Sequence, residues 1–385
     1  MRKLLGLLGI MGLMGVLPIE PILPINPIYA QTTDSAALSF RVNGYLFFWD
    51  NEYFGRRIEG YTLPGFHLTP KLIWSNGKRL TLEGGVSWLH YWGAHSYPNT
   101  MSYGVLPDYS DTSTWMHVVP WLQAKLQIAK GLELTLGSIN PSENHLLPQP
   151  LRNIEREIAA DPECGLMLDA WNDWGHANLW IDWREFIWNQ SPRQERFTMG
   201  LSGKIFLDLP TTDFSISLPA HFIAQHVGGQ VLAQTTPIQN NFNAATGLGI
   251  NYYATDYWTI AMKCYAMLYH QHGNSAVPFT HGWGLYPELV TEYRNRAGLQ
   301  LSYWRGERFV PLMGSWLYSN LSAVDGTTVF DRTEMLSLRA WYKWSPTDEP
   351  FCLHIEGSAH YDIGEQQAQY SVGCVLCFYP KFRLR

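Results

Sequence analysis

The residues whose types and spacing could do chemistry gather in one segment, "NPSENHLLPQPLRNIEREIAADPE", residues 140–163. Acids and bases alternate in it, and its candidate functional residues are Glu143, His145, Arg152, Glu155, Arg156 and Glu157, with Asp161 and Glu163 behind them. Carboxylates, guanidiniums and an imidazole at this density can form a charged lining that selects ions and small solutes. Within the segment, "LRNIEREIAA" has helical periodicity, with Leu151, Ile154 and Ile158 on one face.

Motifs for catalysis are missing from the sequence. It contains no Gly-x-Ser-x-Gly elbow, His-Glu-x-x-His pair, P-loop or dinucleotide fingerprint. Carboxylate pairs such as Glu288 with Glu292 could serve a glycosidase, but among 33 acids some such pair can always be found. His270 and His272 share a strand face, yet no carboxylate or Cys stands near them to complete a metal site. We assign no catalytic residue, metal or cofactor and predict a protein that is not an enzyme, with a hydrolase or glycosidase at the rim of the fold as the alternative.

The N-terminus has the pattern of a secretory signal. Met1-Arg2-Lys3 precedes an apolar stretch at 4–17, and a small residue, Ala30, precedes a polar start at Gln31. We predict a signal peptide at 1–30; a membrane anchor is disfavoured because prolines interrupt the run short of the roughly 20 residues that a spanning helix needs. Removing two basic residues and one acidic residue changes the formal charge from −6 to −7, which argues against binding to nucleic acid.

Aromatic residues dominate the composition. The chain has 17 Trp, 21 Tyr and 17 Phe, whereas charged residues make up only 16%, against roughly 25% in soluble domains. The five cysteines form no dense framework, and Cys374 and Cys377 would point to opposite faces of a strand. A secreted, aromatic-rich chain without apolar helices is either a soluble all-β domain or an outer-membrane β-barrel.

These residues must be positioned by strands, because strand-like segments fill the chain after residue 30. We predict sixteen of them, at 38–49, 61–74, 79–92, 115–129, 131–139, 164–171, 176–188, 196–208, 213–227, 245–255, 258–270, 284–293, 297–305, 332–344, 351–361 and 368–383. The segment 310–320 could be a further strand, so the count ranges from 14 to 18. Links alternate between short turns such as "SNGK" and long polar loops such as 93–114, 140–163 and 306–331. This alternation predicts a transmembrane antiparallel up-and-down β-barrel with short periplasmic turns and long external loops.

Alternation within strands separates a lipid face from a lumen face. In 176–188, Leu179, Ile181 and Trp183 alternate with Asp182 and Arg184, and Glu185 breaks the pattern near the strand end. Charged groups are costly against lipid and stable in a watery lumen. We therefore expect the strand acids and bases to line the barrel interior, and the candidates there are Lys71, Lys125, Asp182, Arg184, Arg196, Lys204, Lys263, Arg339 and Glu356.

With its signal peptide, periodic strands, alternating links and aromatic C-terminal segment "YSVGCVLCFYPKFRLR", the chain resembles the porin-like outer-membrane β-barrels of Gram-negative bacteria over residues 31–385. It departs from them by ending Phe382-Arg383-Leu384-Arg385 rather than in an aromatic residue, as in the Bacteroidetes lineage. The resemblance implies that the third long loop, 140–163, folds inward to narrow the pore, where its acids would face the wall cations. The alternative for this loop is a solvated helix outside the barrel.

Aromatic residues near the external rim suggest a second kind of site. Tyr53, Tyr97 and Tyr103 lie within long loops, where they could grip sugar rings, whereas most strand-end Trp and Tyr fit an interfacial girdle. The predicted function is a porin-like channel for passive uptake of small hydrophilic solutes. Its partners would be outer-membrane lipid and those solutes, with a homo-oligomer or a surface partner as additional options. A plugged barrel that binds a surface glycan or protein is the alternative, followed by a secreted carbohydrate-active protein.

Overall fold

A computed structural model describes residues 36–93, 117–140, 143, 145–186, 194–208, 213–229, 238–273, 277–346 and 349–384. The predicted signal peptide and its cleavage site lie outside them. The strands are β1 (Ala37–Phe54), β2 (Glu59–Ser75), β3 (Leu80–Tyr91), β4 (His117–Ala129), β5 (Leu132–Ile139), β6 (Glu163–Asn172), β7 (Gly175–Glu185), β8 (Glu195–Asp208), β9 (Phe214–Gly228), β10 (Gln239–Tyr253), β11 (Trp258–His272), β12 (His281–Tyr293), β13 (Ala297–Glu307), β14 (Thr333–Trp344), β15 (Phe351–Asp362), β16 (Gln367–Phe378) and β17 (Lys381–Arg383). Three short helices interrupt the loops: η1 (Gln149–Leu151), α1 (Arg156–Ala159) and η2 (Trp316–Tyr318).

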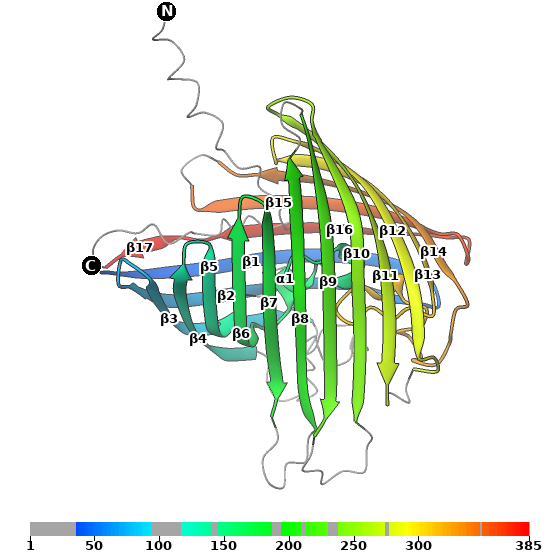
Figure 1. Cartoon of the computed structure of the whole chain (residues 1–385), viewed down its shortest axis with the longest axis horizontal. Helices are drawn as coiled ribbons and strands as arrows, with labels where there is room; N and C mark the ends of the chain where they lie inside the picture. The colour runs from blue at the N-terminus through cyan, green and yellow to red at the C-terminus, as the bar shows by residue number, and fades with distance from the viewer. Residues whose placement is uncertain are drawn as a thin grey trace, which may run out of the picture.

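The strands close into a sixteen-stranded antiparallel barrel. Each strand pairs with its sequence neighbours, and β1 pairs with both β2 and β16, so no edge remains open (Figure 1). The short β17 continues beyond β16 and pairs with the start of β1. Closure gives each strand a hydrogen-bonded neighbour on both sides, and backbone N–H and C=O groups surrounded by lipid require such partners. The predicted fold class and strand number are confirmed.

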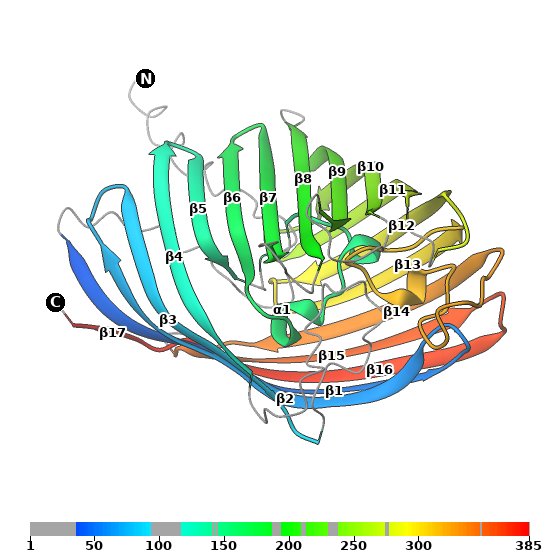
Figure 2. The same ribbon diagram turned by 90° about the horizontal axis from the view of Figure 1, so that it is seen from below.

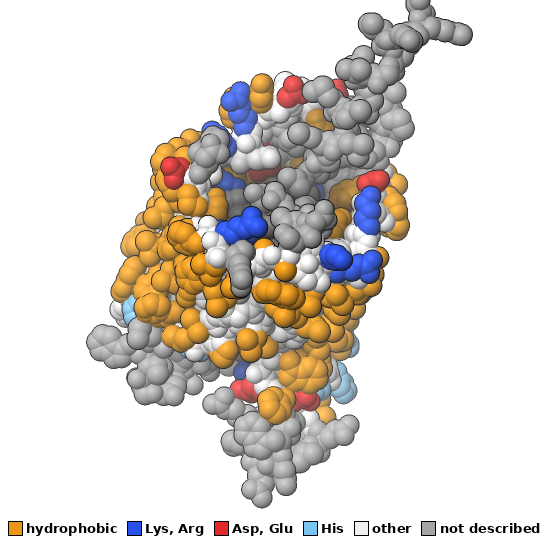
Figure 3. Space-filling model, turned by 90° about the vertical axis from the view of Figure 1, so that its left-hand side faces the viewer, with side chains coloured by type: hydrophobic (Ala, Val, Ile, Leu, Met, Phe, Trp, Pro, Cys, Tyr) orange, Lys and Arg blue, Asp and Glu red, His pale blue; other side chains and the backbone are white. Residues whose placement is uncertain are grey.

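The two faces of the wall differ as the alternation predicts. On β4, Val118 and Leu122 are 53% and 65% exposed, whereas Trp121 and Gln123 are 2% and 7% exposed. Hydrophobic side chains dominate the outer face shown in Figure 3. A closed barrel with an apolar exterior is the architecture of the Gram-negative outer membrane, and the chain is an outer-membrane β-barrel. In the described part of the chain, none of the helices has the length and apolar character needed to cross a membrane.

On β7 the alternation holds up to a local irregularity. Leu179 and Trp183 are exposed outward, and Asp182 is buried inward. The register with β8 shifts between Trp183 and Glu185, and Glu185 faces Arg196 at 3.9 Å. The β-bulge therefore explains why Glu185 breaks the sequence pattern.

Differences from the predicted elements are confined to the ends and links. The first external link is only 55–58, because β1 and β2 are longer than predicted, and the last is only 363–366. The final predicted strand, 368–383, is interrupted at Tyr379-Pro380, since proline has no N–H for the ladder. Residues 310–320 form no strand; they enter the barrel as irregular chain with η2.

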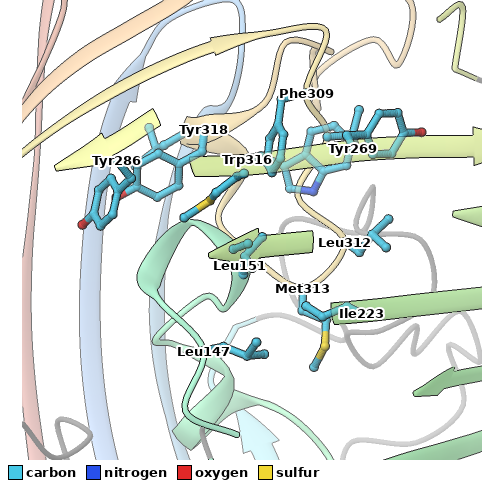
Figure 4. Packing of buried hydrophobic residues seen from close by; sticks show 14 of the residues in the cluster. Leu147, Leu151, Ile223, Tyr269, Tyr286, Phe309, Leu312, Met313, Trp316 and Tyr318 are labelled. Carbon is cyan, nitrogen blue, oxygen red and sulfur yellow. The ribbon is translucent and has the colours of Figure 1, made fainter. Parts of the chain in front are cut away.

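The hydrophobic core of this barrel lies inside it. Among the described residues, the 308–332 segment and the described part of the 140–162 segment fold inward, and both lie within the ring of strands in Figure 2. Leu147 and Leu151 from the first segment pack in one cluster with Leu312, Met313 and residues of the wall (Figure 4). The Asn153 N–H donates to the carbonyl of Met313 at 2.8 Å, which ties the two segments together.

Candidate functional site

The structure places the 140–162 segment against inward-facing wall residues. Glu155 accepts hydrogen bonds from Asn51 and Tyr61, both at 2.8 Å, and the Tyr91 hydroxyl donates to the carbonyl of Ala159 at 2.6 Å. The segment therefore lies inside the barrel and is not a solvated helix outside it. The α-helix is shorter than the periodicity of 151–160 predicts: α1 spans only Arg156 to Ala159, and Leu151 ends the separate short helix η1.

A buried charge cluster anchors this segment at β6. The Glu163 carboxylate accepts from His145 Nε2 at 2.7 Å and lies 3.5 Å from Arg152 and 3.7 Å from Arg156. The other ring nitrogen of His145 faces Asn178 Oδ1 at 2.8 Å, and the ring stacks on Trp180 at 3.9 Å between centroids. Burial, and then Arg152, lower the pKa of Arg156, while Glu163 opposes that shift. The Glu163 carboxylate is thus the shared contact of two guanidiniums and an imidazole in a space closed to solvent.

The cations predicted on the wall are arranged differently from the expectation. Six of the seven pair with carboxylates of the wall itself: Lys71 with Glu83 at 2.7 Å, Lys125 with Glu133 at 3.6 Å, Arg184 with Asp182 at 2.6 Å, Arg196 with Glu185 at 3.9 Å, Lys263 with Glu288 at 3.2 Å, and Arg339 with Glu356 at 2.6 Å. Loop acids also act on them electrostatically, Glu143 on Lys125, Asp161 on Arg184 and Glu157 on Arg339. The expected field between loop acids and wall cations is thus weakened by pairing within the wall. A constriction role for these residues stays a prediction.

The second inward segment was not recognised in the sequence. Phe309, Val310, Leu312, Met313, Trp316, Leu317 and Tyr318 are each at most 3% exposed. Asn320 fixes the fold of this segment, because its amide donates to the carbonyls of Gly306 and Phe330 and accepts from the Phe309 N–H. Burial raises the pKa of Tyr318. The available signal was the run "FVPLMGSWLY", which is too apolar for an external loop in water.

Between the two segments and the wall remains a small polar cavity of about 30 Å³. It is lined by Tyr53 and Tyr61 of the wall, Glu155 of the first segment and Tyr318 of the second, with Glu356 and His360 beside them. Tyr53 was expected in an external loop, but it belongs to β1 and faces inward, where it donates to Asn51 at 3.0 Å. Tyr97 and Tyr103 lie outside the described residues.

A larger cavity of about 990 Å³ opens at the external end of the barrel. Its lining mixes charge and aromatic surface, and includes Arg57, Trp283, Arg308, Phe330 and Arg332. Arg57 at its base forms a buried ion pair with Asp362 and lies 4.6 Å from the Phe330 ring.

Ser87 and His67 have the geometry of a nucleophile and its base. His67 Nδ1 lies 3.2 Å from the carbonyl of Ile158, so this nitrogen carries the hydrogen and Nε2 can accept from the Ser87 hydroxyl at 2.7 Å. Both side chains are sealed beneath α1, with Ser87 1% and His67 3% exposed. In the described residues, no three His, Cys, Asp or Glu side chains gather as a metal site would require.

Comparison with known proteins identifies a family and supports the fold. The lipid A 3'-O-deacylase-type family matches residues 30–385. OmpTdeltaL8, a loop deletion mutant of an outer membrane protein of Vibrio cholerae, is 11% identical, with a TM-score of 0.50 over 90% of this chain and 100% of its own. OpdK of Pseudomonas aeruginosa, solved with vanillate, is 9% identical, with a TM-score of 0.50 over 91% of this chain and 99% of its own. The curated proteins give no match. The chain thus belongs to the lipid A 3'-O-deacylase-type family and folds as a porin-like outer-membrane barrel.

Proposed function

We propose that this protein is an outer-membrane channel for small hydrophilic solutes, with its lumen narrowed by the 140–162 and 308–332 segments. The observation that carries the proposal is the polar cavity between the segments and the wall, flanked by charged residues. Sixteen strands enclose a lumen wide enough for water, and the inward segments reduce the open space here to about 30 Å³, roughly the share of one water molecule. The passage in this conformation is therefore small and polar.

The substitution Tyr53→Ala should widen the passage, because its side chain lines the cavity without belonging to the anchoring charge cluster. We expect proteoliposomes carrying this variant to swell faster than wild type in a small sugar such as arabinose. The matched control is Phe54→Ala, the next residue on β1, whose side chain is 56% exposed on the outer face and should leave the rate unchanged. Equal swelling rates for Tyr53→Ala and wild type would place the solute route elsewhere.

The family match favours a second candidate, hydrolysis of an acyl ester of lipid A in the outer leaflet. Ser87 as nucleophile and His67 as base could carry it: His67 takes the Ser87 proton, the serine oxygen attacks the acyl carbonyl, and the sugar hydroxyl leaves with that proton. Water then releases the fatty acid from the serine. Their burial beneath α1 ranks this activity second, since an acyl chain would have to displace that helix. Incubating the folded barrel with lipid A vesicles and weighing the lipid by mass spectrometry tests it. Loss of one acyl chain with wild type, but not with Ser87→Ala, would put hydrolysis first.

A further inference from the structure

One part of the inner wall presents polar groups without partners. His221 on β9 is 4% exposed, and neither of its ring nitrogens has a hydrogen-bond partner in the described part of the chain. The hydroxyl of Ser202, its register partner on β8, has none there either. Burying polar groups unpaired costs on the order of 1–3 kcal/mol each, so such groups in a native protein point to a bound molecule or water. Both residues belong to the inward-facing side of the wall.

Lys204, two residues along the same face of β8, adds an ammonium without an ion-pair partner among the described residues. Of the seven wall cations predicted from the sequence, it is the one without a carboxylate within 4.0 Å among the described residues. Glu288, the wall acid that acts on Lys204, is already engaged by Lys263 at 3.2 Å and by Gln300 at 2.9 Å. Lys204 lies close enough to Lys263 and His221 to interact electrostatically with both. Lys204 therefore supplies an ammonium with no carboxylate of its own, while Glu288 and Glu292 both act on Lys263.

Aromatic surface lies beside these donors. The Tyr265 ring packs against Gly247 of β10, where a Cβ would approach Tyr265 to 3.0 Å, and its centroid is 6.2 Å from that of His221. A second ring, Phe206, is 5.9 Å from the Lys204 ammonium. An ammonium, an imidazole and a hydroxyl next to two ring faces match an anion that also has an apolar face.

We propose that Lys204, His221 and Ser202 form a binding site on the lumen wall for a small organic monocarboxylate, with Tyr265 against its apolar part. The site deepens the proposed channel function, because it names the class of solute. A single carboxylate matches the one ammonium, Lys204, that has no ion-pair partner among the described residues. Charge-assisted hydrogen bonds supply the affinity, as basic groups do in anion-selective pores.

Equilibrium binding of benzoate to the folded full-length barrel in detergent micelles tests this site without requiring conduction. We expect benzoate to bind, and its neutral isostere benzamide to bind at least about tenfold more weakly, since a charged hydrogen bond contributes roughly 1.5–3 kcal/mol. Lys204→Gln should weaken benzoate binding by a similar factor, and Lys204→Arg should retain the binding. Lys78→Gln, which removes an exposed lysine of the turn between β2 and β3, should leave the binding unchanged. Each variant is first checked for folding by its heat-dependent mobility in SDS.

The outcomes separate this site from the channel itself. Benzoate binding that depends on Lys204 in a barrel that conducts no ions would support the site and overturn the channel. A conducting barrel that binds benzoate and benzamide equally, or that binds benzoate unchanged after Lys204→Gln, would overturn the site and leave the channel standing.

Discussion

Replacing Glu163 by Gln should lower the free energy of unfolding by about 3–5 kcal/mol, the usual effect of removing one partner from a buried ion pair. Its carboxylate is 1% exposed and is the shared contact of His145, Arg152 and Arg156. Without it, two guanidiniums that are 3% and 2% exposed would remain buried without this counter-charge. The denaturant midpoint of the barrel in detergent, followed by tryptophan fluorescence, measures the change.

The matched control is Glu185→Gln. This carboxylate also faces an arginine, Arg196 at 3.9 Å, but the two side chains are 26% and 42% exposed. Exposed pairs contribute about 0–1 kcal/mol, so the midpoint should hardly move. The double variant Glu163→Gln with Arg152→Met should recover part of the loss, because it removes one of the uncompensated charges. Equal small effects from Glu163→Gln and Glu185→Gln would show that the cluster does not anchor the segment.

Removing the second inward segment should have the largest effect on permeation. Gly306 and Thr333 are register partners on β13 and β14, so a short turn can replace residues 308–331 without changing the wall. The lumen then loses the buried side chains of Phe309, Leu312, Trp316 and Tyr318, and water fills their place. We expect single-channel conductance to rise several-fold, because a sixteen-stranded barrel without inward loops encloses an aqueous channel.

The control shortens the same loop where it does not enter the barrel. Val324, Asp325 and Thr327 are exposed at its tip, and replacing 324–327 by two glycines leaves the buried part in place. This variant should conduct like wild type. An equal rise in both variants would mean that loop length, rather than the buried segment, controls permeation.

Much of the wall could be predicted from the sequence, because lipid and water impose a strict alternation on every strand. The pattern places Leu122 outside and Gln123 inside, and all sixteen predicted strands overlap observed ones. The same alternation brings Asp182, Arg184, Arg339 and Glu356 to the inner face. The alternation does not predict which of these residues form ion pairs with one another. Arg339 contacts Glu356 because β14 and β15 are neighbours in a register that follows from the turn between them.

The filling of the lumen was predicted only in part, since loops carry no such periodicity. The charged residues of 140–163 mark this segment as a candidate site in the sequence. That Glu163 contacts His145, Arg152 and Arg156 together follows only from the structure. In the sequence, the 308–332 segment is compatible with a loop or a strand. Its apolar run can form an inward loop only because the barrel encloses it. Tyr53 was assigned to the rim because β1 is longer than its sequence pattern suggests.

A channel whose polar passage is kept narrow by the inward segments is tested most directly by single-channel recording in planar bilayers. Wild type and the variant lacking 308–331 would be recorded side by side in concentrated salt, each shown beforehand to be folded and inserted. We expect small, stable conductance steps from wild type and steps several-fold larger from the variant. Absence of conductance from both proteins would contradict the proposed channel, and would leave hydrolysis or binding as the function of the barrel.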